Sequence, residues 1–403
     1  MKYLPALLCS CAAAWGALLH GEVRVWTLAE GKKAEGEYIS VEKDKVRVLI
    51  KGREQSIKLA SLSPEDREYV RVRRERELSP GSVHENNNFN ARWPSSSAME
   101  DKQKARAVQE KDGDFIYETS HFRFYSPARL SLGTVVEIGR IFEGTYSANL
   151  LIPLNPPCRR YEEDAEAKLP ARLFLTKEAY AQATGGVHAG SAGLFNGTEV
   201  LVPFESLGIV KKGKVYTREP GARVDSHTLV HEITHQMTMF GAKTLSGKPY
   251  TLPIWYAEGI AEYVGVTPYR NGNLKFTGTR KALASYVIGG PGVSGRQLGA
   301  QFSSPPLRRF MEQSIQEYQS ARGGEVIQFN YGMSLVLFYY FAHIDGRGDA
   351  ARLKRWMRAL QNDECEPTDY GRLLDGRSWE QLEKEVARGV KSKLGISIDF
   401  EDA

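Results

Sequence analysis

A chain of 403 residues with 41% hydrophobic and 26% charged residues has the composition of an ordinary globular protein, which excludes collagen-like, disordered and multi-span membrane proteins. This length predicts two or three folding units, each large enough to bury its own core. The 54 Lys and Arg residues outnumber the 49 Asp and Glu residues, which leaves a net charge of +5. Because the charges are spread along the chain, whereas nucleic-acid-binding domains concentrate them on one face, no nucleic-acid partner is indicated.

The first residues have the pattern of a secretory signal peptide. Lys2 precedes a mostly apolar run from Leu4 to Leu19, and charged residues resume only at Glu22. One positive charge followed by about 15 apolar residues is typical of such a signal, whereas a spanning helix needs ~20. We therefore expect residues 1–21 to be removed and the mature chain, without a membrane span, to be periplasmic or secreted. The segment Leu8-Cys9-Ser10-Cys11 resembles a lipoprotein acylation box only faintly, so a lipid anchor is the weaker reading.

Two cysteines, Cys158 and Cys365, remain once residues 1–21 are removed. An exported protein with two cysteines can form one disulfide in its oxidising surroundings. The alternative is a pair of buried thiols, and the spacing in the sequence does not decide between them.

Short alternating segments from Val23 to Ile50 predict a small β unit. Apolar and polar residues alternate within these segments, and glycines and charged residues separate them, as in the strands of a small barrel. A last strand runs into a helix start, with Pro64 in the first turn. The Trp-Thr opening, the Gly-Lys-Lys turn and the Leu-Ser-Pro-Glu-Asp-Arg-Glu-Tyr-Val ending resemble the SH3-like homology domain of actin-cytoskeleton assembly proteins and of exported bacterial proteins. The resemblance implies an SH3-like β-barrel at residues 22–78, which would bind an envelope partner or act as a spacer and carry no chemistry.

The residues after this unit have the composition of a linker. A basic run with arginines at 71, 73, 74 and 76 is followed by asparagines, serines and prolines, which bury too little apolar surface to fold alone. We expect a linker at residues 79–113 and one large domain at residues 114–403.

The large domain has strands in its first half and helices in its second half. This order predicts an α+β fold with a mixed sheet and a helical C-terminal half. The expected strands lie at 115–117, 122–125, 171–175 and 199–202, and the expected helices at 132–150, 177–184, 329–341, 350–361 and 379–394.

The segment His231-Glu232-Ile233-Thr234-His235 is the decisive motif. Histidines at i and i+4 lie ~6 Å apart along a helix and ~40° apart around it, so both imidazoles can bind a single Zn²⁺ at ~2.1 Å. Glu232 is adjacent, as in the metallopeptidase helix motif in which this glutamate is the general base. The alternative is a surface helix with two unrelated histidines. Apolar residues at 229, 230 and 233 favour a buried helix, whose polar groups need partners that a metal supplies.

His227 lies on the same helical stripe. It is ~12 Å from His235 along the axis, too far to share one ion. We expect His227 in the first turn, beside the ligands and not among them, with Asp225 or Ser226 as the N-cap.

The third ligand must come from another segment. A metzincin would have Gly and His at positions 238 and 241, where this chain has Thr238 and Gly241, so that class is excluded. A glutamate on the next helix is the alternative, and Pro253–Tyr263 supplies one. Here the chain resembles the gluzincins, the thermolysin and aminopeptidase-N group of zinc peptidases. It is most similar to the peptidase-MA-like domains of exported bacterial proteins, through their Trp-x-x-Glu-Gly-x-Ala-Glu-Tyr helix.

The resemblance assigns a role to each matching residue. It implies a thermolysin-like or aminopeptidase-like zincin fold with one zinc ion held by His231, His235 and Glu258, and Glu232 as the base that accepts a proton from the water. Glu262 matches the acidic residue that hydrogen-bonds a metal-bound histidine. Since Glu258 and Glu262 are i and i+4, the swapped assignment stays open. The segment from Gly193 to Val202 matches the edge strand that receives the substrate backbone.

A donor to the developing oxyanion is also required in such an enzyme. Tyr331 lies where aminopeptidase relatives carry a catalytic tyrosine, and Tyr256 and His343 are its rivals.

The function expected from these patterns is an exported zinc-dependent peptidase acting on a peptide or protein. Two alternatives are a catalytically degenerate metal-binding scaffold or adhesion module of the cell envelope, and a zinc amidase acting on a cell-wall peptide. The presence of Glu232 argues against the scaffold, which needs no base.

Overall fold

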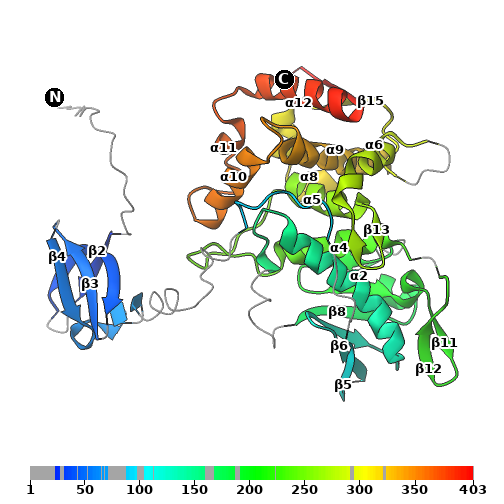
Figure 1. Ribbon diagram of the computed structural model, residues 1–403, viewed down its shortest axis with the longest axis horizontal. Coiled ribbons are helices and arrows are strands. Elements are labelled where there is room, and N and C mark those ends of the chain that lie inside the picture. Colours follow the sequence, from blue (N-terminus) through cyan, green and yellow to red (C-terminus); the bar gives the residue numbers. More distant parts are fainter. Residues whose placement is uncertain are drawn as a thin grey trace, which may run out of the picture. The chain divides into compact units, whose positions relative to one another are not determined.

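The computed structural model divides the chain into two compact units, Met1–Asn86 and Asn87–Ala403 (Figure 1). It describes residues 23–27, 31–42, 44–51, 53–64, 66–67, 69–70, 88–97, 104–111, 113–158, 168–186, 191–222, 224–290, 295–320 and 324–402. The expected signal peptide at residues 1–21 and the arginine run at 71–76 lie outside the described residues.

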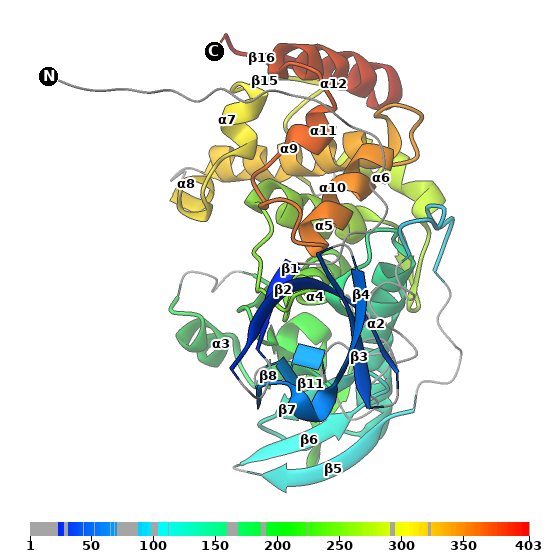
Figure 2. The same cartoon turned by 90° about the vertical axis from the view of Figure 1, so that its left-hand side faces the viewer.

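The first unit is an antiparallel meander of four strands, visible as the curved sheet in Figure 2. The strands are β1 (Val23–Thr27), β2 (Lys33–Glu42), β3 (Lys45–Ile50) and β4 (Arg53–Lys58), and a 3₁₀ turn, η1 (Leu59–Ser61), follows them. Trp26 is fully buried in a small core and donates its Nε1–H to Gly36 O at 3.0 Å. Among the described residues β1 and β4 are the edges of an open sheet. The structure thus shows a small β unit, and the closed barrel expected from the sequence does not form between these strands.

The second unit begins with a mixed six-stranded sheet of order β5-β6-β7-β8-β10-β9. Its strands are β5 (Arg106–Lys111), β6 (Asp114–Glu118), β7 (Phe122–Ser126), β8 (Leu169–Phe174), β9 (Leu194–Phe195) and β10 (Val200–Pro203). The pairs β7/β8 and β8/β10 are parallel and the others antiparallel, since α2 (Leu132–Leu151) and α3 (Lys177–Ala183) supply the crossovers that parallel strands need. The short strand β9 is one edge of this sheet.

The remainder of this unit is mainly helical, which confirms the expected α+β class. The helices are α4 (Ser226–Met239), α5 (Ile254–Val266), α6 (Thr279–Ile288), α7 (Leu307–Met311), α8 (Ile315–Ser320), α9 (Gly324–His343), α10 (Ala351–Gln361), α11 (Gly371–Leu374) and α12 (Trp379–Leu394). Three short pairs are β11 (Ile209–Lys212) with β12 (Val215–Arg218), β13 (Tyr269–Arg270) with β14 (Asn273–Leu274), and β15 (Gln301–Ser304) with β16 (Ser397–Phe400). The 3₁₀ turns are η3 (Phe204–Leu207) and η4 (Phe276–Gly278).

Helix α5 lies at the centre of the helical half, and each of its residues is buried. It packs on α4 on one side and on α9 on the other. Gly259 permits the close approach to α9, because a Cβ at this position would lie 2.6 Å from the backbone oxygen of Ser334. Any larger residue would push α5 away from α9 and disturb the side chains that α5 presents to α4.

The prediction of a linker at residues 79–113 is wrong for residues 88–97 and for β5. Both belong to the second unit. Asn88 donates to Leu150 O and Ile152 O at the end of α2, at 2.8 and 2.6 Å, and Phe89 is buried. Trp93 donates its Nε1–H to Tyr263 OH at 2.7 Å. A composition rich in Asn, Ser and Pro suggested a linker, but two aromatic anchors and one capping side chain are enough to attach the segment to a neighbouring core.

Of the two alternatives that the sequence left open for the cysteines, the structure has the one without a disulfide, because Cys158 and Cys365 are not bridged. Cys158 is buried in the large core and Cys365 is half-buried against it. Both residues therefore pack as small apolar side chains, a common role for unbridged cysteines.

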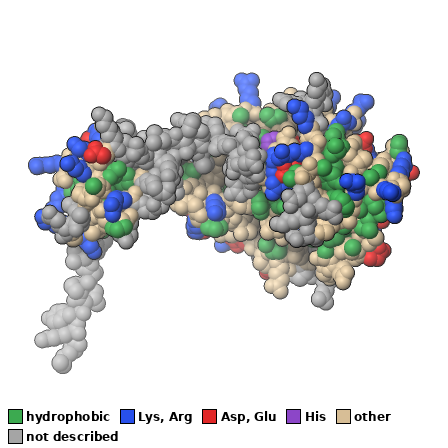
Figure 3. Space-filling view, turned by 90° about the horizontal axis from the view of Figure 1, so that it is seen from below, with side chains coloured by type: hydrophobic (Ala, Val, Ile, Leu, Met, Phe, Trp, Pro, Cys, Tyr) green, Lys and Arg blue, Asp and Glu red, His purple; other side chains and the backbone are tan. Residues whose placement is uncertain are grey.

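The surface of the described residues carries charges of both signs. On the face drawn in Figure 3, Lys and Arg side chains are scattered among neutral ones. None of the helices that the structure describes is long and apolar enough to cross a membrane.

Candidate metal centre

Helix α4 carries the motif into the interior of the second unit. Its N-cap is Asp225, whose Oδ1 accepts a hydrogen bond from Thr228 N at 3.1 Å, which confirms one of the two expected caps. The apolar residues at 229, 230, 233 and 237 are buried against α2 and the sheet. The opposite stripe, which holds His231 and His235, faces α5.

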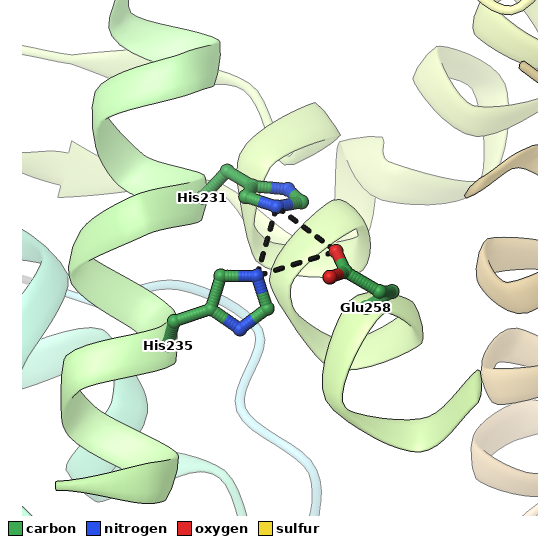
Figure 4. A group of neighbouring side chains, drawn as sticks. All are labelled: His231, His235 and Glu258. Atoms are coloured by element: carbon green, nitrogen blue, oxygen red, sulfur yellow. Dashed lines mark hydrogen bonds and ion pairs between the residues drawn. The ribbon is translucent and has the colours of Figure 1, made fainter. Parts of the chain in front are cut away.

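Three nitrogen and oxygen atoms from α4 and α5 converge on one point (Figure 4). The Nε2 atoms of His231 and His235 are 3.0 Å apart, and each lies 3.2 Å from Oε2 of Glu258. All three side chains are buried. Three ligands of a tetrahedral ion with bonds of ~2.1 Å are separated by ~3.4 Å. The donor set and its spacing therefore fit a single metal ion of the size of Zn²⁺.

The charges of this group favour metal binding. The carboxylates of Glu258 and Glu262 raise the pKa of His231 far above its ordinary value, although burial acts in the opposite direction. Burial would raise the pKa of Glu258, yet the two imidazoles lower it to about 2. Each group thus favours the charged form of the other. A bound cation would compensate the Glu258 carboxylate in place of an imidazole proton, so metal uptake would release a proton.

The structure separates the two candidate glutamates by the nitrogen that each one contacts. Glu258 faces the two Nε2 atoms, whereas Glu262 Oε1 lies 3.1 Å from Nδ1 of His231. Glu262 is fully buried and binds Arg296, with Oε1 2.5 Å from Nη2 and Oε2 3.3 Å from Nε. A carboxylate in this position would orient the imidazole of His231 if Nε2 of that ring bound a metal.

His227 lies beside the group and outside it. Its Nε2 is 3.9 Å from Oε2 of Glu262, and its ring packs on Tyr286 with centroids 4.8 Å apart. It is not among the three residues whose atoms converge, in agreement with its distance from His235 along the helix.

Glu232 is held at the wall of the site by the sheet edge. Its Oε2 accepts a hydrogen bond from the backbone N–H of Phe195 in β9 at 2.8 Å. Burial raises the pKa of Glu232, and the two histidines counteract the rise. A carboxylate with a raised pKa is a better proton acceptor near neutral pH than an exposed glutamate.

A cleft of about 1100 Å³ opens over these residues. Its walls are β9 with the turn that follows, one side each of α4 and α5, and parts of α6, α8 and α9. His227 and Met239, at opposite ends of α4, both line it, and that stretch of helix is ~18 Å long. The cleft therefore continues past the three converging residues in both directions along α4.

Only one of the three candidate oxyanion donors faces this cleft. Tyr331 on α9 lines it, with its ring centroid 6.0 Å from that of His231. Nearby carboxylates, Glu258 first, together with burial, raise the pKa of Tyr331, so its phenol stays protonated and can donate. Tyr256 is instead buried between Trp255 and Phe338, and the Nε2 atom of His343 lies 2.9 Å from Tyr263 OH, away from the cleft lining.

Arg296 is the main cleft residue that sequence reasoning missed. It lies in a glycine-rich loop between α6 and β15 and belongs to no motif, so no local signal indicated it. A buried carboxylate at 262 needs a cation, and that requirement was the only available hint.

Comparisons with protein-family models, with curated proteins and with solved structures find no match to this chain.

Proposed function

We propose that this protein is an exported, zinc-dependent peptidase with a gluzincin-like catalytic domain, preceded by an SH3-like binding or spacing module. The observation that carries the proposal is the convergence of His231 Nε2, His235 Nε2 and Glu258 Oε2, with Glu232 held beside them by a sheet edge. Two imidazoles and one carboxylate leave a coordination position open, as catalytic zinc sites do and closed structural sites do not.

Zinc at these three residues would polarise a substrate carbonyl and lower the pKa of water. Glu232 accepts the proton of the attacking water and returns it to the nitrogen of the leaving amine. The phenolic O–H of Tyr331 donates a hydrogen bond to the oxygen on which negative charge develops. Glu262 keeps the His231 imidazole oriented and proton-bearing at Nδ1, which leaves Nε2 free for the metal.

The form of the cleft supports an extended peptide as the substrate. The side of β9 that faces away from β10 can accept the substrate backbone as an additional antiparallel or parallel strand. At ~3.3 Å per residue, the ~18 Å of cleft along α4 accommodates about five residues. Because the cleft runs past the metal site in both directions, residues on both sides of the cleaved bond have room.

The test compares the wild type with Glu232→Gln, using metal analysis and digestion of a mixed peptide library. We expect both proteins to hold about one zinc ion and only the wild type to cleave, because the amide cannot accept the proton. Glu118→Gln is a matched control, since Glu118 on β6 is a buried carboxylate that is paired with Arg106 and Arg123 and does not line the cleft. It should cleave as the wild type does.

Two other outcomes would replace this proposal. A wild-type protein that binds zinc but cleaves none of the varied peptides would be a metal-binding scaffold. Cleavage confined to cell-wall peptides would make it an amidase.

A further inference from the structure

Arg296 contacts two different parts of the candidate site at once. The edge of its guanidinium binds Glu262 through Nε and Nη2, and Nη1 donates to Gln328 Oε1 at 2.8 Å. Its face lies over the ring of Tyr331, with Cζ 4.3 Å from the ring centroid. One planar cation thus joins the carboxylate behind His231 to the candidate oxyanion donor.

The backbone around Arg296 is held in place as well. Arg296 N donates to Tyr286 O at 2.8 Å, and Leu298 N donates to Val287 O at 2.7 Å, so the loop is attached to the end of α6. Gly332 on α9 lets this loop approach, because a Cβ there would lie 2.6 Å from Leu298 Cδ1. The side chain of Arg296 is only 16% exposed. Its position is therefore set from both ends, by the loop and by Glu262.

We propose that Arg296 is a positioning residue that couples Tyr331 to the metal ligand His231 through Glu262. This inference rests on the proposed function for the role of Tyr331, and on the three-residue metal group for the role of Glu262. A guanidinium can bind a carboxylate along its edge and stack on an aromatic ring with its face at the same time. A lysine ammonium can supply the charge to Glu262 but has no plane to set the angle of the Tyr331 ring.

The two contacts can be separated by Arg296→Lys and Arg296→Met in the full chain. We expect Arg296→Lys to keep the zinc affinity of the apo protein within about threefold and to lower kcat about tenfold or more, with KM changed less than twofold. Arg296→Met, which removes the charge from behind His231, should lower zinc affinity about 10- to 100-fold. Arg377→Lys is the matched control, because Arg377 is a buried arginine paired with Asp345 and Glu385, and it should change neither quantity.

A double-mutant comparison with Tyr331→Phe tests the coupling. If Arg296 acts through Tyr331, adding Arg296→Lys to Tyr331→Phe should lower kcat less than twofold further, and the combined shift in Tm should be smaller than the sum of the single shifts. Equal effects of Arg296→Lys in both backgrounds, on kcat and on Tm, would overturn the coupling. Unchanged zinc affinity in Arg296→Met would overturn the link to His231. Should the wild type prove inactive, the proposed function fails, while zinc affinity and Tm additivity still decide the role of Arg296.

Discussion

Glu262 Oε1 lies 3.1 Å from Nδ1 of His231, and the other nitrogen of the same ring faces Glu258. The two glutamates are one helical turn apart on α5, so both can reach one imidazole. The roles proposed for them differ only because the ring has two distinct nitrogens. Glu258, the proposed ligand, lies beside the nitrogen that faces the other donors, and Glu262, the proposed orienting carboxylate, lies beside the nitrogen that faces away.

This arrangement predicts different losses of metal affinity for the two glutamates. Glu258→Ala removes a ligand and should abolish stoichiometric zinc binding at micromolar protein. Glu262→Ala leaves three donors in place and should weaken binding about 10- to 100-fold. Titration of the apo proteins with Zn²⁺ measures both. The reverse order of effects would show that Glu262 is the ligand, which the sequence had left open.

The burial of His343 predicts that the free energy of unfolding falls as the pH is lowered. Burial lowers the pKa of His343 to about 4, whereas an unfolded histidine titrates near 6.5. Below pH ~6.5 the unfolded chain therefore binds the proton more readily than the folded chain, and stability is lost as the pH falls towards 4. From pH 7 to pH 5 this residue alone should lower the free energy of unfolding by about 2 kcal/mol.

Urea denaturation of the wild type and of His343→Gln at both pH values isolates that contribution. Glutamine does not titrate, so the variant should lose less stability on acidification than the wild type. Equal losses in the two proteins would show that His343 is protonated as easily in the folded state as in the unfolded one.

The contacts of residues 88–97 predict that the stability of the second unit depends on a segment whose composition resembles that of a linker. Trp93→Phe keeps most of the buried ring and removes the hydrogen bond to Tyr263 OH, so it should cost about 1 kcal/mol. Trp93→Ala also removes the contacts with Phe338 and His343 and should cost about 3 kcal/mol.

Thermal unfolding of the full chain, followed by circular dichroism, measures these losses. Trp26→Phe, in the first unit, is a control that should leave the transition of the second unit unchanged. If residues 79–113 were a free linker, both variants at Trp93 would unfold like the wild type.

The features that the sequence predicted are those governed by local geometry. The i and i+4 spacing of His231 and His235 places both on one side of a helix, whatever surrounds it. Asp225 caps that helix because a carboxylate at its start can accept a backbone N–H within its own turn. The ranges of α2, α10 and α12 followed from periodicity for the same reason.

Features that depend on distant segments were decided only by the tertiary structure. The choice between Glu258 and Glu262 depends on how α5 rotates against α4, since both lie on the same stripe of their own helix. The attachment of residues 88–97 through Trp93 and the absence of a bridge between Cys158 and Cys365 could not be read from the sequence, because burial and pairing are properties of the partner surface and not of the neighbouring residues. The sequence by itself determined that two histidines and a glutamate share one helix. Only the packing of α4, α5, α9 and the loop at Arg296 decided which groups meet them, because a buried charge is stable only where another part of the chain compensates it.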